Sequence, residues 1–344
     1  MTIYVTHGSK KNVGDYLIHD RGRALIERVL PSAFVRSIPR WNRDALPSDA
    51  GHLVLCGGPG ISSRMLEDTF PIAERALATG VPLSGIALGW SGVPARDPGA
   101  FQLSERSIEA FRSIESTGEP LTVRDDLTLE ILASAGIGAI RTGCTAWYSL
   151  PDLKKPIGRF RRPQTIVFTT PARPQNTLES TAIMRRLKAR YPRARLIASF
   201  HRGVLPDKET GFARSATLVA QALVAKMLGF EVLDAAYDLS KIDFYRHADL
   251  HIGYRVHAHL SFVSQHRPSI LLCEDGRGHG QATTLNGEES VLWAGEEGLV
   301  DRVDAILSEE EHNGWQSLHQ AVDVIESSYP FMEAAVRRLG KAIA

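Results

Sequence analysis

The chain has few of the features that mark a secreted, membrane-spanning or nucleic-acid-binding protein. Its 344 residues include only three cysteines, Cys56, Cys144 and Cys273, which lie far apart and show no paired spacing. This usage argues against a disulfide framework and favours a reducing compartment. The formal net charge is +1, from 40 Lys and Arg against 39 Asp and Glu, so no overall charge attracts nucleic acid.

Long hydrophobic runs are also missing. Residues 3–5 form the only apolar run before His7, and no segment approaches the length of a membrane span. A hydrophobic content of 43% and a charged content of 23% are ordinary for folded domains. We therefore expect a soluble cytoplasmic protein, and the length of the chain favours two domains.

Short apolar runs alternate with segments of helical periodicity along the whole chain. The runs that predict buried strands include residues 52–56, 82–88, 165–169, 196–200 and 250–252. This alternation predicts an α/β protein with right-handed crossovers and mostly parallel sheets.

A basic segment with three prolines, residues 151–163, interrupts the alternation and is the best candidate for a connector between domains. Its charge is most simply explained by solvation, although attraction to an acidic or lipid-linked substrate is the alternative. We expect an N-terminal domain over residues 1–155 and a C-terminal domain over residues 156–312. A helix over residues 313–344 closes the chain, and its return across both domains is a hypothesis.

The segment 250–257 carries the strongest functional signal. Its first three residues end a predicted strand, Gly253 is a hinge, and helical periodicity follows. Ligands of open α/β sheets bind beyond the carboxyl ends of strands, where free helix N–H groups favour anions. Arg255 offers a planar fork to a carboxylate or phosphate, and His257 can carry a proton near neutral pH. The two side chains point the same way only if the backbone between them is extended.

Three further motifs stand at predicted strand ends in the first half. Their polar and glycine positions are Asn12, Gly14, Asp15, Gly57, Gly58, Gly60, Arg124 and Asp125. In the first motif, a helix cap at Asp15 and a ligand contact are both open interpretations. The glycine turn has the spacing of neither a dinucleotide fingerprint nor a phosphate loop, yet it lets a ligand approach the backbone. In the third motif, a local ion pair is the simpler explanation.

Polar residues of the second half offer additional candidates. Four histidines lie between residues 247 and 259, but no Cys or carboxylate spacing completes a zinc site, so we expect no metal. His201 ends another predicted strand. Arg277 and His279 lie in residues 275–287, which we expect to be a Gly-rich polar loop, and could contact a phosphate. For His279, a solvated loop position is the simpler explanation.

These motifs form an ordered set along the chain. It comprises Asn-Val-Gly-Asp at 12–15, the glycine turn, Val-Arg-Asp at 123–125, Tyr-Arg-Val-His at 254–257, Pro-Ser-Ile-Leu at 268–271 and Asp-Gly-Arg at 275–277. Together they resemble the polysaccharide pyruvyl transferase family over roughly residues 1–290, most specifically in the Arg-X-His element. Two departures lie on the acceptor side: Pro59 replaces the usual third glycine, and residues 144–146 replace a segment that often contains an acidic residue.

The resemblance implies two Rossmann-like domains that face each other across a cleft, as in the glycosyltransferase-B architecture. It also implies transfer of the enolpyruvyl group of phosphoenolpyruvate to a sugar of a polysaccharide, glycan or lipid-linked precursor, with release of phosphate and formation of a pyruvate ketal. Such a product belongs to exopolysaccharide or cell-envelope synthesis at the cytoplasmic side, where a peripheral membrane contact stays open. The reaction needs no cofactor besides its donor substrate.

The same resemblance places Arg255 and His257 at the donor, with Tyr254 in the same element. Ketal formation requires protonation of the enol methylene carbon, and a neighbouring phosphate and carboxylate raise the pKa of a histidine. We therefore expect His257 to be protonated when the donor is bound. A general base for the sugar hydroxyls is expected from the N-terminal domain, with Asp15 and Asp125 as candidates.

Two other functions stay open. A nucleotide-sugar-dependent glycosyltransferase of the same architecture often has two glutamates separated by seven residues, and Glu288 and Glu296 have that spacing. Glu289 and Glu297 share it in the same Glu-rich stretch, so coincidence explains both pairs. The other alternative is a non-catalytic glycan-assembly protein with a decayed site, against which the Arg-X-His element argues.

Overall fold

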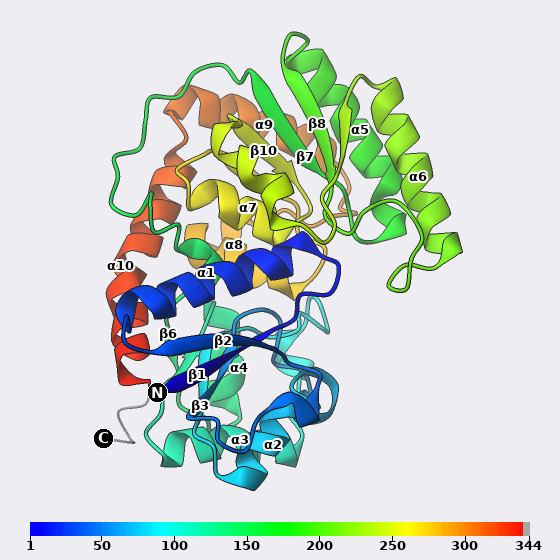
Figure 1. Ribbon diagram of the computed structural model, residues 1–344. Helices are drawn as coiled ribbons and strands as arrows, with labels where there is room; N and C mark the ends of the chain where they lie inside the picture. Colours follow the sequence, from blue (N-terminus) through cyan, green and yellow to red (C-terminus); the bar gives the residue numbers. More distant parts are fainter. Residues whose placement is uncertain (340–344) are drawn as a thin grey trace.

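The computed structural model describes residues 1–339, which form two α/β halves stacked one above the other (Figure 1). Residues 340–344, the end of the predicted closing helix, lie outside the described residues. Each half contains one sheet in which every strand pair is parallel. None of the helices within residues 1–339 has the length and apolarity needed to cross a bilayer.

The N-terminal half is built on a six-stranded sheet with the order β2-β1-β3-β4-β5-β6. Its strands are β1 (Thr2–His7), β2 (Phe34–Pro39), β3 (His52–Cys56), β4 (Leu83–Leu88), β5 (Leu121–Val123) and β6 (Ile140–Arg141). Its helices are α1 (Val13–Val29), α2 (Pro71–Thr79), α3 (Glu105–Ser116) and α4 (Asp126–Ser134). Every residue of β3 and β4 is buried, because helices cover both faces of a parallel sheet.

The C-terminal half is built on a five-stranded sheet with the order β11-β10-β7-β8-β9. Its strands are β7 (Thr165–Thr169), β8 (Arg195–Phe200), β9 (Glu231–Asp234), β10 (Leu250–Gly253) and β11 (Ser269–Leu271). Its helices are α5 (Thr177–Arg190), α6 (Phe212–Met227), α7 (Val256–Val263), α8 (Gly276–Asn286), α9 (Leu299–Asn313) and α10 (Gln316–Arg338).

The strand order reverses between β1 and β3 in the first sheet and between β7 and β10 in the second. At such a switch point the helices that follow neighbouring strands cover opposite faces of the sheet, which leaves a crevice at the carboxyl ends. In the second sheet the register places Ile252 of β10 beside Phe168 of β7 and Ile270 of β11. The segment with Arg255 and His257 therefore follows a central strand, directly at the switch point.

Helix α10 runs along one side of both halves (Figure 1). Near its start, the Ser317 carbonyl accepts a hydrogen bond from Asn286 of α8. Further along, the Tyr329 ring packs edge-on against Tyr148 and Ser328 accepts a hydrogen bond from Arg141 of β6. Because one rigid helix contacts both halves, it helps to fix their relative position.

One sequence-based expectation about local structure is wrong, and one of two open interpretations is excluded. Residues 276–286 form helix α8 instead of a loop, because Asp275 caps the helix through the Arg277 N–H and the glycines allow close packing. A Cβ added at Gly276 would lie 2.2 Å from the Trp90 ring. Helix α1, in turn, is capped by Asn12, which accepts the Gly14 N–H at 3.4 Å, and not by Asp15.

Candidate active site

The carboxyl ends of the two sheets face each other and their loops are in contact. The Val13 N–H, at the start of α1, donates to the His201 carbonyl after β8 (3.1 Å). The Gly276 N–H, at the start of α8, donates to the carbonyl of Gly92, which follows β4 (3.2 Å). The two switch points therefore enclose a common space between the halves.

A cavity between these edges is lined from both halves. Its lining residues are Asn12, Arg124, Ala172, His201, Tyr254, Arg255, Val256, His257, Glu274, Asp275 and Arg277. The structure thus brings together Asn12, Arg124, His201, Tyr254, Arg255, His257 and Arg277 from the residues that the sequence predicts for the site. Its volume of about 40 Å³ makes it a narrow space between the two edges.

Arg255 reaches this cavity because the backbone before α7 is extended. Gly253 has a φ of 148°, and a Cβ there would lie 2.4 Å from the Thr169 carbonyl oxygen. Arg255 itself is extended (φ −98°, ψ 107°) as the residue before the helix, and its N–H donates to Thr169 Oγ1 at 3.2 Å. Only Arg255 is extended, however: Val256 and His257 already belong to α7, so the extended backbone expected between Arg255 and His257 is not present. Both side chains nevertheless line the cavity, Arg255 from the residue before the helix and His257 from its first turn.

The Arg255 guanidinium is only partly satisfied within the protein. Its Nη2 donates to the Pro171 carbonyl at 3.2 Å, whereas its buried Nε has no hydrogen-bond partner among residues 1–339. Burial lowers the pKa of Arg255 to about 10, with Glu274 opposing this shift and Arg202, Arg277 and Arg214 adding to it. A guanidinium that is charged, buried and incompletely bonded is suited to bind an anion.

His257 is neutral in the absence of substrate. Burial, followed by the charges of Arg124 and Arg277, lowers its pKa to about 3. The same two arginines line the cavity, so an anion bound there would offset their charge and favour the protonated imidazole. Protonation at neutral pH is therefore expected only when an anion is bound.

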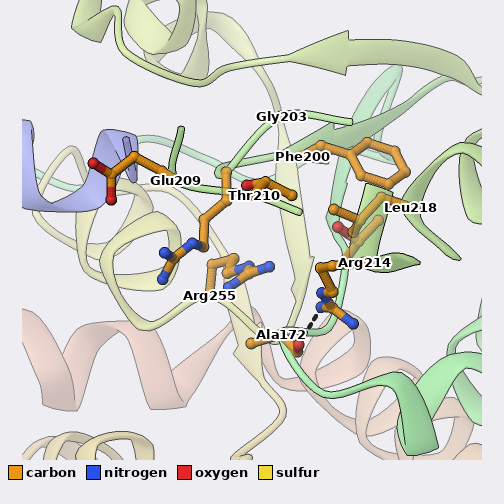
Figure 2. Close-up of a pocket in the computed structure, with 10 residues that line it drawn as sticks. Ala172, Phe200, Gly203, Glu209, Thr210, Arg214, Leu218 and Arg255 are labelled. Atoms are coloured by element: carbon orange, nitrogen blue, oxygen red, sulfur yellow. Dashed lines mark hydrogen bonds between the residues drawn. The ribbon is translucent and has the colours of Figure 1, made fainter. Parts of the chain in front are cut away.

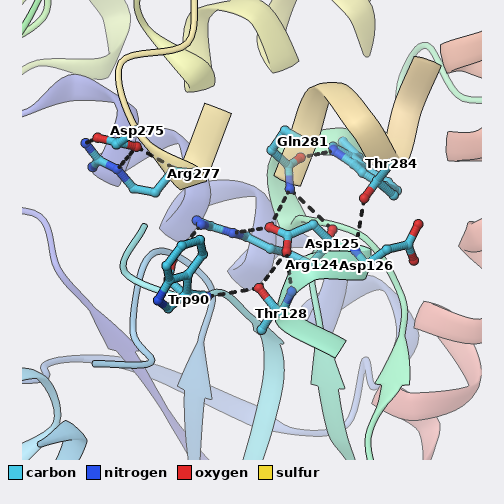
Figure 3. A network of polar contacts seen from close by, with 10 residues as sticks. Trp90, Arg124, Asp125, Asp126, Thr128, Asp275, Arg277, Gln281 and Thr284 are labelled. Carbon is cyan, nitrogen blue, oxygen red and sulfur yellow. Dashed lines mark hydrogen bonds and ion pairs between the residues drawn. The ribbon is translucent and has the colours of Figure 1, made fainter. Parts of the chain in front are cut away.

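Arg124 reaches the cavity from the N-terminal half, and a polar network fixes its side chain (Figure 3). Its Nε pairs with Asp125 at 2.9 Å and its Nη2 donates to the Trp90 carbonyl at 2.9 Å. Asp125 also accepts hydrogen bonds from Thr128, through its N–H at 2.8 Å and its hydroxyl at 2.6 Å, and from Gln281 at 3.2 Å. The local ion pair between Arg124 and Asp125 that the sequence favours is therefore present. Asp125 does not line the cavity.

Arg277 is held by Asp275 in a two-bond ion pair, with Nε–Oδ1 at 2.9 Å and Nη2–Oδ2 at 2.6 Å. His201 is buried, and its Nε2 is joined to the Tyr245 hydroxyl by a hydrogen bond of 3.0 Å. His279 lies on α8 outside the cavity, where its Nε2 is 2.9 Å from Glu288. The structure therefore places His279 outside the cavity, with a carboxylate at its Nε2, and its contact to a phosphate stays a prediction.

Asp15, Gly14 and the glycine turn lie around the site without lining the cavity. Burial raises the pKa of Asp15, with the charges of Arg40 and Arg277 opposing this shift. A Cβ at Gly14 would lie 2.5 Å from His257 Nδ1, so this glycine sets the approach of α1 to the imidazole.

The glycine turn serves the fold. Gly57 and Gly58 have φ values of 59° and 70°, and a Cβ at Gly57 would lie 2.3 Å from Ile18. A Cβ at Gly60 would lie 2.3 Å from the Phe70 ring. A tight turn against the core therefore explains all three glycines without a ligand.

Glu274 is a residue of the site that sequence reasoning missed. Its carboxylate accepts the N–H groups of Ala172 and Arg173 at 2.7 and 2.8 Å and the Asn176 amide at 2.8 Å. It thereby fixes the loop after β7. The available signal was an acidic residue three positions beyond the end of a buried strand.

No group of three or more His, Cys, Asp or Glu residues within the described part of the chain is placed to hold a metal ion. The donor set of the cavity, which is dominated by arginines, is instead suited to anions.

Comparison with solved structures shows the same architecture at low sequence identity. A putative UDP-N-acetylglucosamine 2-epimerase from Listeria monocytogenes aligns with a TM-score of 0.59 and 11% identity, covering 99% of this chain and 96% of that one. A MnaA–UDP structure from S. aureus aligns with a TM-score of 0.56 and 11% identity, covering 97% and 94%. These likenesses show the glycosyltransferase-B fold, which confirms the predicted fold class.

No curated protein matches the sequence significantly. The family described as polysaccharide pyruvyl transferase matches residues 12–272, which include Asn12, Arg124, Arg255 and His257. The match spans well over half of the chain, and it agrees with the motifs, the paired sheets and the arginine-lined cavity between them. The chain is a transferase that belongs to the polysaccharide pyruvyl transferase family.

Proposed function

We propose that the enzyme transfers the enolpyruvyl group of phosphoenolpyruvate to a sugar of a glycan or lipid-linked precursor, where it forms a pyruvate ketal and releases phosphate. The observation that carries this proposal is the convergence of Arg124, Arg255, Arg277 and His257 on one cavity between the two switch points. Three guanidinium groups match a donor that carries both a carboxylate and a phosphate.

Arg255 is the best-placed group to bind the donor. Its free Nε and its position at the end of a central strand allow a two-bond contact to a carboxylate or phosphate. Arg124 and Arg277 are held by carboxylates, so they would act as fixed positive walls. A substrate that neutralises this charge also removes two causes of the low pKa of His257.

The proposed reaction uses His257 as the general acid. Its proton goes to the methylene carbon of the enol, which becomes the methyl group, and the electron deficit moves to the carbon that carries the phosphate and carboxylate. A first sugar hydroxyl adds to that carbon and gives up its proton. A second hydroxyl displaces the phosphate, which leaves with its bonding electron pair and takes the second proton.

The general base for the sugar hydroxyls would be Asp15. It is close enough to Arg277 to feel its charge, and burial raises its pKa, which makes the carboxylate a better proton acceptor. Asp125 is unsuited to this role because Arg124, Thr128 and Gln281 already occupy its oxygens.

The structure gives no support to the two-glutamate feature of a nucleotide-sugar glycosyltransferase. Glu288 contacts His279 and Thr283 at the surface, and Glu296 pairs with Arg96 and Arg302. Neither glutamate lines the cavity. Both carboxylates therefore serve surface ion pairs.

The test is to incubate the protein with phosphoenolpyruvate and a panel of nucleotide sugars and glycans, and to quantify phosphate and nucleoside diphosphate. We expect acceptor-dependent phosphate release that Arg255→Lys weakens through loss of the two-bond fork. Arg185→Lys is the matched control, because Arg185 is exposed on α5. Release of nucleoside diphosphate without phosphate would show that the protein is a glycosyltransferase instead. Release of neither product would show that it is a non-catalytic binding protein.

A further inference from the structure

A second cavity adjoins the first on the side of the C-terminal half. It has a volume of about 200 Å³ and is lined by residues after β7, β8 and β10 and on α6. Three arginines, Arg202, Arg214 and Arg255, contribute to its wall, and Glu209 is the one carboxylate among its lining residues. Arg255 and Ala172 belong to both cavities, so the two spaces are neighbours.

The arginines of this second cavity have unused hydrogen-bonding capacity. Figure 2 shows Arg214 and Arg255 on two sides of Ala172, whose carbonyl accepts a hydrogen bond from Arg214 Nη2. The buried Nη1 of Arg214 has no partner within residues 1–339, whereas the free Nε of Arg255 is the atom that would bind the donor. Arg202 is exposed and makes no ion pair with a described carboxylate.

The loop between β8 and α6, residues 201–211, forms part of this cavity and is held by a residue of the N-terminal half. Lys11, which precedes α1 and is buried, pairs with Asp207 at 2.8 Å. Its Nζ also donates to Thr210 Oγ1 at 2.7 Å and to the Leu205 carbonyl at 3.3 Å. The position of this loop, and with it the shape of the cavity, therefore depends on contacts between the two halves.

The proposed transfer leaves this cavity without a role. His257 lines the first cavity and not the second, so the reacting carbon of the donor belongs beside the first. Three guanidinium groups against Glu209 on the wall and Glu274, whose charge reaches Arg214 and Arg255, still leave an excess of positive charge, which a bound anion would balance. Because Arg255 stands between the two cavities, that anion would lie next to the donor.

We propose that the second cavity uses Arg202 and Arg214, beside the donor-binding Arg255, to bind the phosphate or diphosphate ester that carries the acceptor sugar. This inference rests on the proposed function, because it names the class of acceptor for the same cleft. A sugar attached to an anchored diphosphate would be presented to the donor at a fixed distance. Exposed apolar side chains, Leu205 and Phe212, flank the loop, so a lipid-linked and a nucleotide-linked diphosphate are both to be tested.

The experiment measures binding of inorganic pyrophosphate, UDP and geranyl diphosphate to the full chain by calorimetry, with saturating phosphoenolpyruvate present to fill the donor site. We expect binding of pyrophosphate, and a loss of about tenfold or more in affinity for each of Arg202→Gln and Arg214→Gln, because each removes a charged hydrogen bond. The KM for phosphoenolpyruvate should stay unchanged. Tighter binding of UDP than of geranyl diphosphate assigns a nucleotide source, and the reverse order a lipid source.

Arg185→Gln is the matched control, since this exposed arginine of α5 lies outside both cavities. Arg202→Gln changes an exposed residue, so it tests the proposal even if Arg214→Gln fails to fold. Wild-type affinity for pyrophosphate in Arg202→Gln and folded Arg214→Gln would overturn the proposal. Competition between pyrophosphate and phosphoenolpyruvate, with a raised KM in the variants, would assign the cavity to the donor instead. If pyrophosphate bound in an arginine-dependent way but phosphoenolpyruvate were not turned over, the proposed donor would be wrong while the anion site would stand.

Discussion

The two edges that form the cleft contribute side chains of different character. On the N-terminal edge, the hydrogen bonds of Arg124 go to Asp125 and to the Trp90 carbonyl, so its position is set by the fold. On the C-terminal edge, Arg255 has a free Nε and His257 is held neutral by its surroundings. Arg124 is thus a fixed charge on the first edge, as Arg277 is on the second, whereas Arg255 and His257 of the second edge are the groups whose bonding and protonation a donor would change.

This difference predicts where substitutions have the largest effect. His257→Asn should lower kcat by about a hundredfold or more, because it removes the general acid while the arginines that bind the donor remain. The measurement is acceptor-dependent phosphate release, with donor binding followed separately by calorimetry. Thermal unfolding of the variant excludes a general loss of structure.

His279→Asn is the control for this substitution, since His279 lies on α8 and contacts Glu288 outside the cavity. Its kcat should stay near that of the unmodified enzyme. Equal losses in both variants would show that the responding groups are not confined to the edge that carries Arg255.

The second prediction concerns the contact between the two edges. In Gly14→Ala the new Cβ would lie 2.5 Å from His257 Nδ1, closer than a real contact allows, so the imidazole must shift. Misplacement of a catalytic group by about 1 Å is expected to lower kcat/KM by on the order of tenfold to a hundredfold. Steady-state kinetics measure the loss.

Gly158→Ala is the matched control, because a Cβ at Gly158 meets nothing within 4 Å. It should leave kcat/KM unchanged. If Gly14→Ala behaved in the same way, the N-terminal edge would play no part in positioning the acid.

The two edges also differ in how far the sequence predicts them. Local patterns were sufficient for the C-terminal edge: residues 250–253 form the buried strand β10, and Arg255 and His257 follow it. The N-terminal edge was harder. Asp125 caps α4 as its position predicts, but only the fold shows that Asn12 and not Asp15 caps α1, and that Gln281 reaches Asp125.

Long-range packing explains the remaining errors. The glycines of residues 276–280 resemble a loop in sequence, but they form a helix because Trp90 and Asp125, distant in the chain, pack against them. The second cavity had no local signal either. Arg202 and Arg214 come from a loop and a helix start, and only the tertiary structure brings them to Arg255.

The third prediction follows from the neutral state of His257. The free enzyme holds the pKa of this group at about 3, through burial and the charges of Arg124 and Arg277. If the donor raises that pKa above the working pH, binding takes up a proton, so affinity should fall as the pH rises, by at most about tenfold per pH unit.

Calorimetry in buffers of different ionisation enthalpy measures this proton uptake directly. The uptake should approach one proton near pH 7 and should decrease in His257→Asn. The titration is repeated at pH 8, where free phosphoenolpyruvate is fully ionised. Proton uptake at that pH therefore belongs to the enzyme and not to the substrate. Equal uptake in both proteins would mean that His257 stays neutral, and the acid would have to be sought elsewhere.

The smallest expected effect tests the competing function. Glu288→Gln and Glu296→Gln should leave phosphate release unchanged, because both carboxylates serve surface ion pairs outside the cavity. Exposed pairs contribute about 0–1 kcal/mol, so the thermal stability should also change little. A large loss of activity in these variants, accompanied by nucleoside diphosphate among the products, would move the chemistry to the surface of the C-terminal half. The difference between the two edges of the cleft would then describe how the halves are held together, and not how a substrate is converted.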